Sequence, residues 1–149
     1  MNKFLIIIIF LFISSCAYEP ILSKKNYNFE FKNISYEGNK KINKIIENRL
    51  INKNSSAKKY DIFFQTSKEK ITIALNKKGD PTIFKITISL NYEIMKDGEK
   101  ILNNNLKKHV TYNNIDDKFE LSQKEDDILI YLSENLTDEI LNSVLVLDK

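Results

Sequence analysis

A strict alternation of apolar and polar residues constrains the fold of this chain more than any other feature. Every second side chain over one long run is threonine or a large apolar group, and these are Thr82, Phe84, Ile86, Ile88, Leu90, Tyr92 and Ile94. The residues between them are mostly Lys, Thr, Ser, Asn and Glu. Because successive side chains of a β-strand point to opposite faces, the pattern predicts a long strand with one buried and one solvated face.

The segments around this strand predict further strands of the same sheet. Asp97-Gly98 is a hairpin signature, so residues 101–112 are expected to return antiparallel to residues 82–94. Near the start of the chain, YNFEFKNISY over residues 27–36 alternates with a one-step phase shift. That shift predicts a strand that contains a bulge.

The segment between residues 60 and 75 allows two interpretations. Apolar residues alternate over 60–64 and again over 71–75, and the polar run TSKEK joins the two stretches. One long strand with an irregularity in its middle fits this pattern, and so do two separate strands. The turn NKKGDP follows, in which Gly79 is free to adopt positive φ.

Two stretches instead have helical periodicity. Apolar residues recur every three or four positions in two sets, first Ile42, Ile45, Ile46 and Leu50, and then Leu129, Leu132, Leu136, Ile140, Val144 and Leu147. Asn39 is available to cap the first helix, and the acidic residues 125–127 suit the start of the second. We therefore predict an α+β, two-layer sandwich of order β-α-β-β-β-α, with a mainly antiparallel four-stranded sheet and both helices on one face.

The N-terminus is typical of an exported protein. Lys3 precedes an uninterrupted apolar run over residues 4–13, which is shorter than the roughly 20 residues that a transmembrane helix needs. A positive start followed by a short apolar region is typical of a secretory signal peptide. We therefore expect residues 1–15 to be removed.

The only cysteine of the chain lies where this leader ends. The residues Ile13-Ser14-Ser15 lead directly into Cys16, and this junction resembles a bacterial lipobox. The resemblance implies that diacylglycerol is attached to the Cys16 thiol, that the leader is cut before it, and that the new amino terminus is acylated, with palmitate as a typical chain. Two or three acyl chains hold a protein firmly to a membrane. Ala17 is not the aspartate that retains such lipoproteins in the inner membrane, which favours the periplasmic leaflet of the outer membrane.

The domain boundaries follow from this leader. Residues 1–15 are the signal peptide, residues 16–26 a lipidated tether, and residues 27–149 a single α/β domain. Without the leader and its Lys3, the chain has 22 basic and 20 acidic residues. A balance this even does not indicate nucleic-acid binding.

The sequence offers little for catalysis or metal binding. His109 is the only histidine, so no second histidine or spare cysteine can complete a zinc site with it. The acidic residues 116–117 and 125–127 are explained by loop solvation and helix capping, and three glycines are too few for a phosphate loop. We expect a non-enzymatic protein with no metal and no cofactor besides the acyl chains on Cys16.

The chain resembles the LptE family of outer-membrane lipoproteins. The resemblance covers most of the mature chain and rests on the order of four segments, which are CAYEPI at residues 16–21, NKIIENRL in the first helix, TIFKITISLNYEI in the long strand, and VTYNNIDDKF before the last helix. It implies a two-layer domain that plugs the LptD β-barrel, assists its assembly, and helps to transport and insert lipopolysaccharide into the outer leaflet.

The resemblance also implies which residues contact lipopolysaccharide. In the family, basic residues in loops bind this lipid, and Lys77, Lys78, Lys118 and Lys124 lie at comparable places. Ser122 stands where a basic residue of the family is expected. Lysines would act there as point charges whose attraction to phosphate is weakened by salt.

Two other functions fit the same leader. A free-standing periplasmic lipid-binding protein would have an apolar cavity and would need no barrel. A structural envelope lipoprotein would need neither lipid nor barrel. A hydrolase is the least supported class, because no recognisable Ser-His-Asp arrangement is present.

Overall fold

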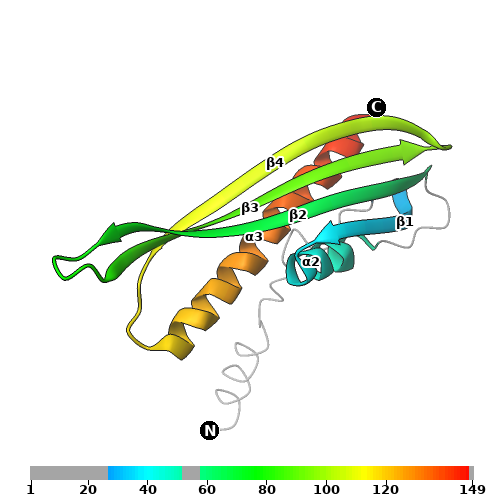
Figure 1. Cartoon of the computed structure of the whole chain (residues 1–149). Coiled ribbons are helices and arrows are strands. Elements are labelled where there is room, and N and C mark those ends of the chain that lie inside the picture. The colour runs from blue at the N-terminus through cyan, green and yellow to red at the C-terminus, as the bar shows by residue number, and fades with distance from the viewer. Residues whose placement is uncertain (1–26, 52–57, 148–149) are drawn as a thin grey trace, which may run out of the picture.

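The computed structural model describes residues 27–51 and 58–147. The elements in this part of the chain are β1 (Phe29–Gly38), α2 (Lys40–Leu50), β2 (Lys58–Leu75), β3 (Pro81–Lys96), β4 (Glu99–Asn113) and α3 (Lys118–Leu147). The strands form one sheet of order β1-β2-β3-β4, in which β1 is parallel to β2 and the other neighbours are antiparallel. Both helices lie on the same side of the sheet (Figure 1), so the predicted α+β fold is confirmed. The leader, the tether and Cys16 lie outside the described residues.

The core lies between the sheet and the helices. The predicted inward face of β3 is buried, and Ile86, Ile88 and Leu90 have no exposed surface. The apolar stripe of α3 packs against it, with Leu136 and Ile140 also completely buried. Burying one such side chain contributes about 1.5–3 kcal/mol, which makes this contact the main source of stability.

The helix ends are fixed by side-chain caps. Asn39 Oδ1 accepts hydrogen bonds from the backbone N–H groups of Lys41 and Ile42, both at 3.1 Å, so the predicted cap of α2 is confirmed. Asp117 caps α3 in the same way, which makes α3 begin at Lys118. The acidic residues 125–127 therefore lie within α3 and not at its start, because Asp117 satisfies the free N–H groups earlier in the chain.

Strand β2 is a single strand through its polar middle. It pairs with β3 without a register shift from Asp61 to Thr72, and its irregularities lie at residues 72–75. Because no bulge interrupts the alternation between Phe64 and Ile71, these two side chains point to opposite faces. Phe64 is buried and Ile71 is exposed. The predicted bulge in β1 is confirmed between Phe31 and Asn33.

The passage from β1 into α2 is held by a close backbone contact. Gly38 has φ +98°, and a Cβ atom there would lie 1.9 Å from the carbonyl oxygen of Thr66 on β2. Asn39 N–H lies within hydrogen-bonding distance of that carbonyl, at 3.3 Å, and of Thr66 Oγ1, at 3.2 Å. Thr66 Oγ1 in turn donates to Asn43 Oδ1 at 2.5 Å, and Asn43 Nδ2 donates to the Glu37 carbonyl at 3.1 Å. Only glycine fits this corner.

We predict that Gly38→Ala lowers the free energy of unfolding by roughly 3–5 kcal/mol, because it adds a steric overlap to an unfavourable φ. Gly79→Ala is the matched control, since Gly79 also has positive φ but a Cβ there would meet no atom within 4 Å. The control should lose only roughly 1–2 kcal/mol. Urea denaturation measures both values, and equal losses would show that the Thr66 contact does not constrain the fold.

Candidate functional site

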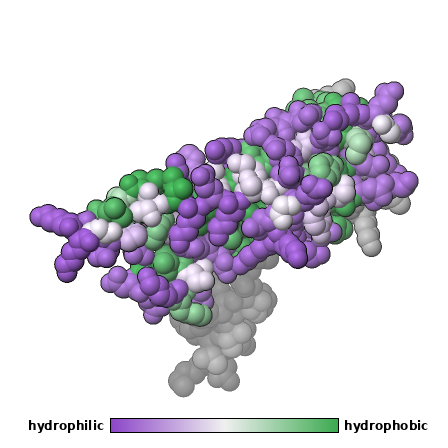
Figure 2. Space-filling view, viewed as in Figure 1, coloured by the Kyte–Doolittle hydropathy of each residue, from purple (hydrophilic) through white to green (hydrophobic). Residues whose placement is uncertain are grey.

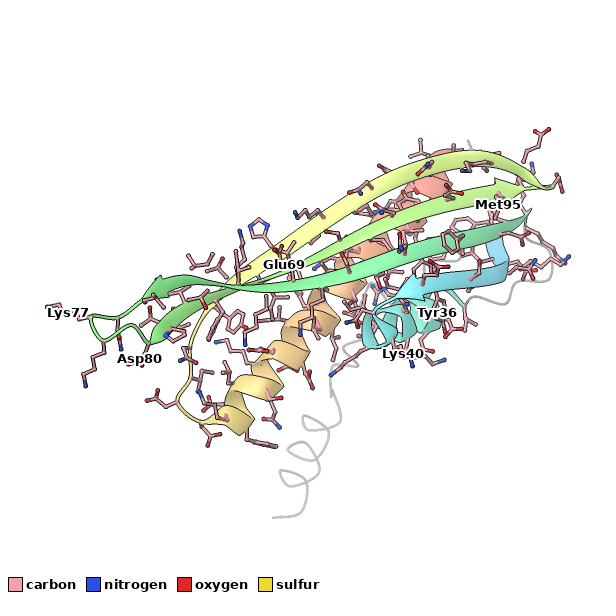
Figure 3. The ribbon with its side chains drawn as sticks, viewed as in Figure 1. Tyr36, Lys40, Glu69, Lys77, Asp80 and Met95 are labelled. Atoms are coloured by element: carbon pink, nitrogen blue, oxygen red, sulfur yellow. The ribbon has the colours of Figure 1, made fainter. Side chains whose placement is uncertain are left out.

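Two of the candidate lysines lie at the tip of the β2–β3 hairpin. Lys77 and Lys78 are exposed in the turn between the strands, and Figure 3 shows Lys77 at the extreme end of the molecule. Asn76 organises this turn, because its Oδ1 accepts hydrogen bonds from the N–H groups of Lys78 at 2.8 Å and Asp80 at 2.9 Å. Gly79 has the predicted positive φ, +87°. The two lysines therefore extend from an ordered turn at the end of the hairpin.

The other two candidates lie at the start of α3, next to the base of the same hairpin. Lys118 and Lys124 are exposed. The β4–α3 loop is bound to the hairpin through Asn114, whose N–H donates to the Thr82 carbonyl at 2.8 Å and whose Nδ2 donates to the Pro81 carbonyl at 2.9 Å. The hairpin tip and the start of α3 consequently lie at one end of the molecule (Figure 1). We call this the distal end and define it as residues 71–83 and 118–124.

The four candidate lysines carry unpaired charges. Within residues 27–51 and 58–147, none of Lys77, Lys78, Lys118 and Lys124 makes an ion pair. Lys32 and Lys96 likewise make no ion pair in this part of the chain. Six other described lysines are paired with carboxylates, and these are Lys41, Lys44, Lys59, Lys70, Lys100 and Lys108. Unpaired, exposed ammonium groups remain available to an anionic ligand.

Exposed apolar side chains accompany these charges at the distal end. On β2, Ile71 is 37% exposed, Ile73 48% and Leu75 60%, and Phe119 at the start of α3 is 72% exposed. Figure 2 shows apolar surface next to the hydrophilic hairpin tip. The sequence carried a signal for this surface that sequence reasoning did not use, because residues 71, 73 and 75 have the opposite parity to the buried residues of β2.

A polar cluster fixes the hairpin to α3. Glu125 Oε1 accepts hydrogen bonds from Lys70 Nζ at 2.5 Å and from the Tyr112 hydroxyl at 2.7 Å. Lys70 Nζ also lies 4.3 Å from the centre of the Phe84 ring. Burial tends to raise the pKa of Glu125, but the hydrogen bonds from Lys70 and Tyr112 and the nearby positive charges outweigh it and lower that pKa. Burial and the bond to Glu125 raise the pKa of Tyr112.

The arginine of the first helix has a structural role. Arg49 binds Asp138 on α3 through three hydrogen bonds of 2.9–3.2 Å, and its Nη1 lies 3.3 Å from a Glu134 carboxylate oxygen. Leu50 beside it is buried. These contacts join α2 to α3, so the arginine-leucine pair that contributed to the family resemblance stabilises the helical layer.

The lone histidine and the acidic residues are the remaining candidates of the sequence. His109 is an exposed residue of β4 opposite Thr87. Among the described residues, no three His, Cys, Asp or Glu side chains gather as metal ligands would. No helix in that part of the chain has the length and apolar character that crossing a bilayer requires.

Comparison with known proteins shows the fold. The chain matches no protein-family model and no curated protein. Its structure is similar to that of rare lipoprotein B from Shewanella oneidensis, with a TM-score of 0.59 and 13% identity over 78% of this chain and 96% of that one. It is also similar to a provisionally assigned lipoprotein from Caulobacter crescentus, with a TM-score of 0.58 and 14% identity over 82% of this chain and 93% of the other.

A third solved structure has the same architecture. The minor lipoprotein from Acinetobacter baumannii has a TM-score of 0.51 and 16% identity, with 75% of this chain and 92% of that chain covered. The three alignments each include nearly the whole of the other chain. This two-layer fold is therefore shared with proteins described as bacterial lipoproteins.

We predict that Glu125→Gln destabilises the protein by about 1 kcal/mol at pH 7, because it breaks a partly buried ion pair. A carboxylate with a lowered pKa contributes stability above its unfolded-state pKa and loses that contribution as the pH falls through its folded-state pKa. The difference between variant and wild type should therefore shrink from about pH 5 toward pH 3. Urea denaturation at several pH values measures this difference in the free energy of unfolding.

Glu69→Gln is the matched control for this experiment. Glu69 is exposed on β2 (Figure 3), and none of the ion pairs in the described part of the chain involves it. A loss of stability equal to that of Glu125→Gln, or one independent of pH, would contradict the role assigned to the cluster.

Proposed function

We propose that this protein is a lipid-anchored envelope lipoprotein whose domain plugs an LptD-type β-barrel and helps to insert lipopolysaccharide into the outer leaflet. Acyl chains on Cys16 would hold it to the periplasmic leaflet of the outer membrane. It would act without catalysis, by occupying the barrel and contacting the lipid. The observation that carries the proposal is the distal end, where unpaired lysines lie beside exposed apolar side chains.

The chemistry of the distal end fits an anionic amphiphile. Lipopolysaccharide carries phosphate groups and acyl chains. The four unpaired lysines offer cations to the phosphate groups. The acyl chains can pack on an apolar surface that costs free energy while it faces water, and this surface comprises Ile71, Ile73, Leu75 and Phe119. Attraction between such exposed charges and phosphate is weakened by salt.

The position of the distal end also supports this function. Phe29 pairs with Lys58 at the start of β2, whereas the hairpin tip follows the end of that strand. A strand of 18 residues spans about 59 Å at roughly 3.3 Å per residue. The domain would thus be tethered at one end and would present its lysines at the other.

The uncovered face of the sheet fits the plug role. Between the distal end and the groove described below, its exposed and half-buried side chains include Ser67, Glu69, Ser89, Lys107 and His109. Large β-barrels have polar interiors, and a polar sheet face can lie against such a wall without burying unpaired apolar surface. A free-standing lipid carrier is less well supported, because six of the eight residues that line the groove of this face have polar side chains.

The first test is purification of the full-length lipoprotein from its own outer membranes in mild detergent. We expect a single β-barrel protein of LptD type to remain bound in stoichiometric amount, which mass spectrometry would identify. Recovery of lipid without a barrel would favour the carrier function. A bare monomer would favour the structural function and contradict the plug.

We predict that Lys77→Glu/Lys78→Glu weakens binding of purified lipopolysaccharide about tenfold or more at low salt, because two attractive charges become repulsive. Added salt should reduce the difference. The matched control is Lys32→Glu/Lys96→Glu, which changes the net charge equally at exposed positions away from the hairpin tip. Equal weakening by both pairs would mean that only net charge matters, and unchanged affinity would exclude the hairpin lysines.

A further inference from the structure

A groove of about 590 Å³ lies across the middle of β2, β3 and β4. Its side chains belong to the sheet face opposite the helices, which Figure 1 shows uncovered. Its walls come from the middle of the sheet and comprise Phe63, Gln65, Asn91, Tyr92, Glu93, Asn103, Asn104 and Asn105. Gln65 lies six residues before Ile71, where the distal end begins on β2, which corresponds to about 20 Å along the strand. The groove is therefore separate from the distal end.

The register of the sheet arranges the groove side chains in two rows. Each row crosses β2, β3 and β4, the first as Phe63, Glu93 and Asn103, and the second as Gln65, Asn91 and Asn105. Neighbouring strands are about 4.8 Å apart, so each row is about 10 Å long. The six side chains form one continuous platform on the open face.

The polar groups of this platform are partly unused. Asn105 Nδ2 donates to Asn91 Oδ1, which orients both amides. The side-chain amides of Gln65 and Asn103 make no hydrogen bond within the described part of the chain. Glu93 is paired with Lys100 at 2.6 Å, so its charge is balanced. The groove thus offers neutral donors and acceptors, with no unpaired cation among its lining residues.

This chemistry suits a neutral ligand that is rich in hydroxyl groups. A carboxamide offers both donor hydrogens and an acceptor oxygen, and a sugar hydroxyl is likewise both donor and acceptor. Phe63 adds a half-buried apolar ring at one end, against which the C–H face of a sugar ring can pack. A phosphate would find no free positive charge here, and an acyl chain would leave the amides without partners.

We propose that this groove binds a neutral oligosaccharide. The amides of Gln65, Asn91, Asn103 and Asn105 would exchange hydrogen bonds with its hydroxyl groups, and the Phe63 ring would contact one sugar face. The inference does not depend on the barrel or on lipopolysaccharide, because the groove residues lie on the open sheet face beyond the residues assigned to the barrel wall, and the isolated protein leaves this face free for a ligand. Saccharide binding and the plug function can therefore succeed or fail separately.

The test uses the full-length protein in micelles of dodecyl-dimethylamine oxide, a detergent without a sugar headgroup. An array of neutral bacterial glycans, followed by calorimetric titration with maltohexaose, chitohexaose and mannohexaose, should identify saturable binding. An oligogalacturonate of similar length is the anionic control and should bind more weakly. Absence of saturable binding by every neutral glycan would overturn the proposal.

Variants locate the binding. Asn103→Ala/Asn105→Ala should weaken it about tenfold or more, because hydrogen bonds to two amides are lost. Phe63→Leu keeps an apolar side chain but removes the flat ring, and it should also weaken binding. Asn113→Ala changes an exposed asparagine of the same strand outside the groove and should leave affinity unchanged. Thermal melting checks that each variant folds, and equal affinity of all variants would place the ligand elsewhere.

Discussion

The rest of the structure depends on the contact between the backbone of Gly38 and the carbonyl of Thr66. At this point the chain leaves β1, turns sharply and enters α2, and a Cβ atom on residue 38 would overlap the carbonyl oxygen. The Asn43 and Thr66 side chains bond to each other beside it, so the buried polar atoms of the corner have partners. The contact keeps β1 parallel to β2 and holds α2 where Arg49 can reach Asp138 on α3. The corner therefore fixes how α2 enters the helical layer.

The functional surfaces follow from the different lengths of the two layers. Strand β2 spans about 59 Å, whereas the 30 residues of α3 span about 45 Å. The helices cannot cover the whole sheet, and the end of the β2–β3 hairpin extends beyond the core with its lysines and apolar side chains exposed. One face of the sheet also remains uncovered. The cluster around Glu125 fixes the hairpin to α3, so the exposed end has a defined direction.

Local patterns were sufficient to predict the fold, whereas the surfaces required knowledge of register. The alternation over β3, the turn at Asp97 and the Asn39 cap each depend on neighbours in the sequence, and all three are confirmed. The Gly38–Thr66 contact and the groove join residues from separate strands, which no local pattern encodes. Whether Ile71 lies on the buried or the exposed face of the sheet depended on whether β2 contained a bulge between Phe64 and Ile71. The resemblance-based lysines share one end of the molecule, but their contact with lipid remains a prediction.

We propose that the distal end lies inside a barrel partner and contacts lipopolysaccharide there. In-cell cross-linking tests this most directly. A photoreactive phenylalanine analogue in place of Ile73 would be activated in intact cells, and the products would be separated and identified by mass. We expect a covalent adduct with one outer-membrane β-barrel protein, together with lipopolysaccharide adducts. Adducts with soluble periplasmic proteins only, or none from a correctly anchored and folded protein, would contradict the plug function.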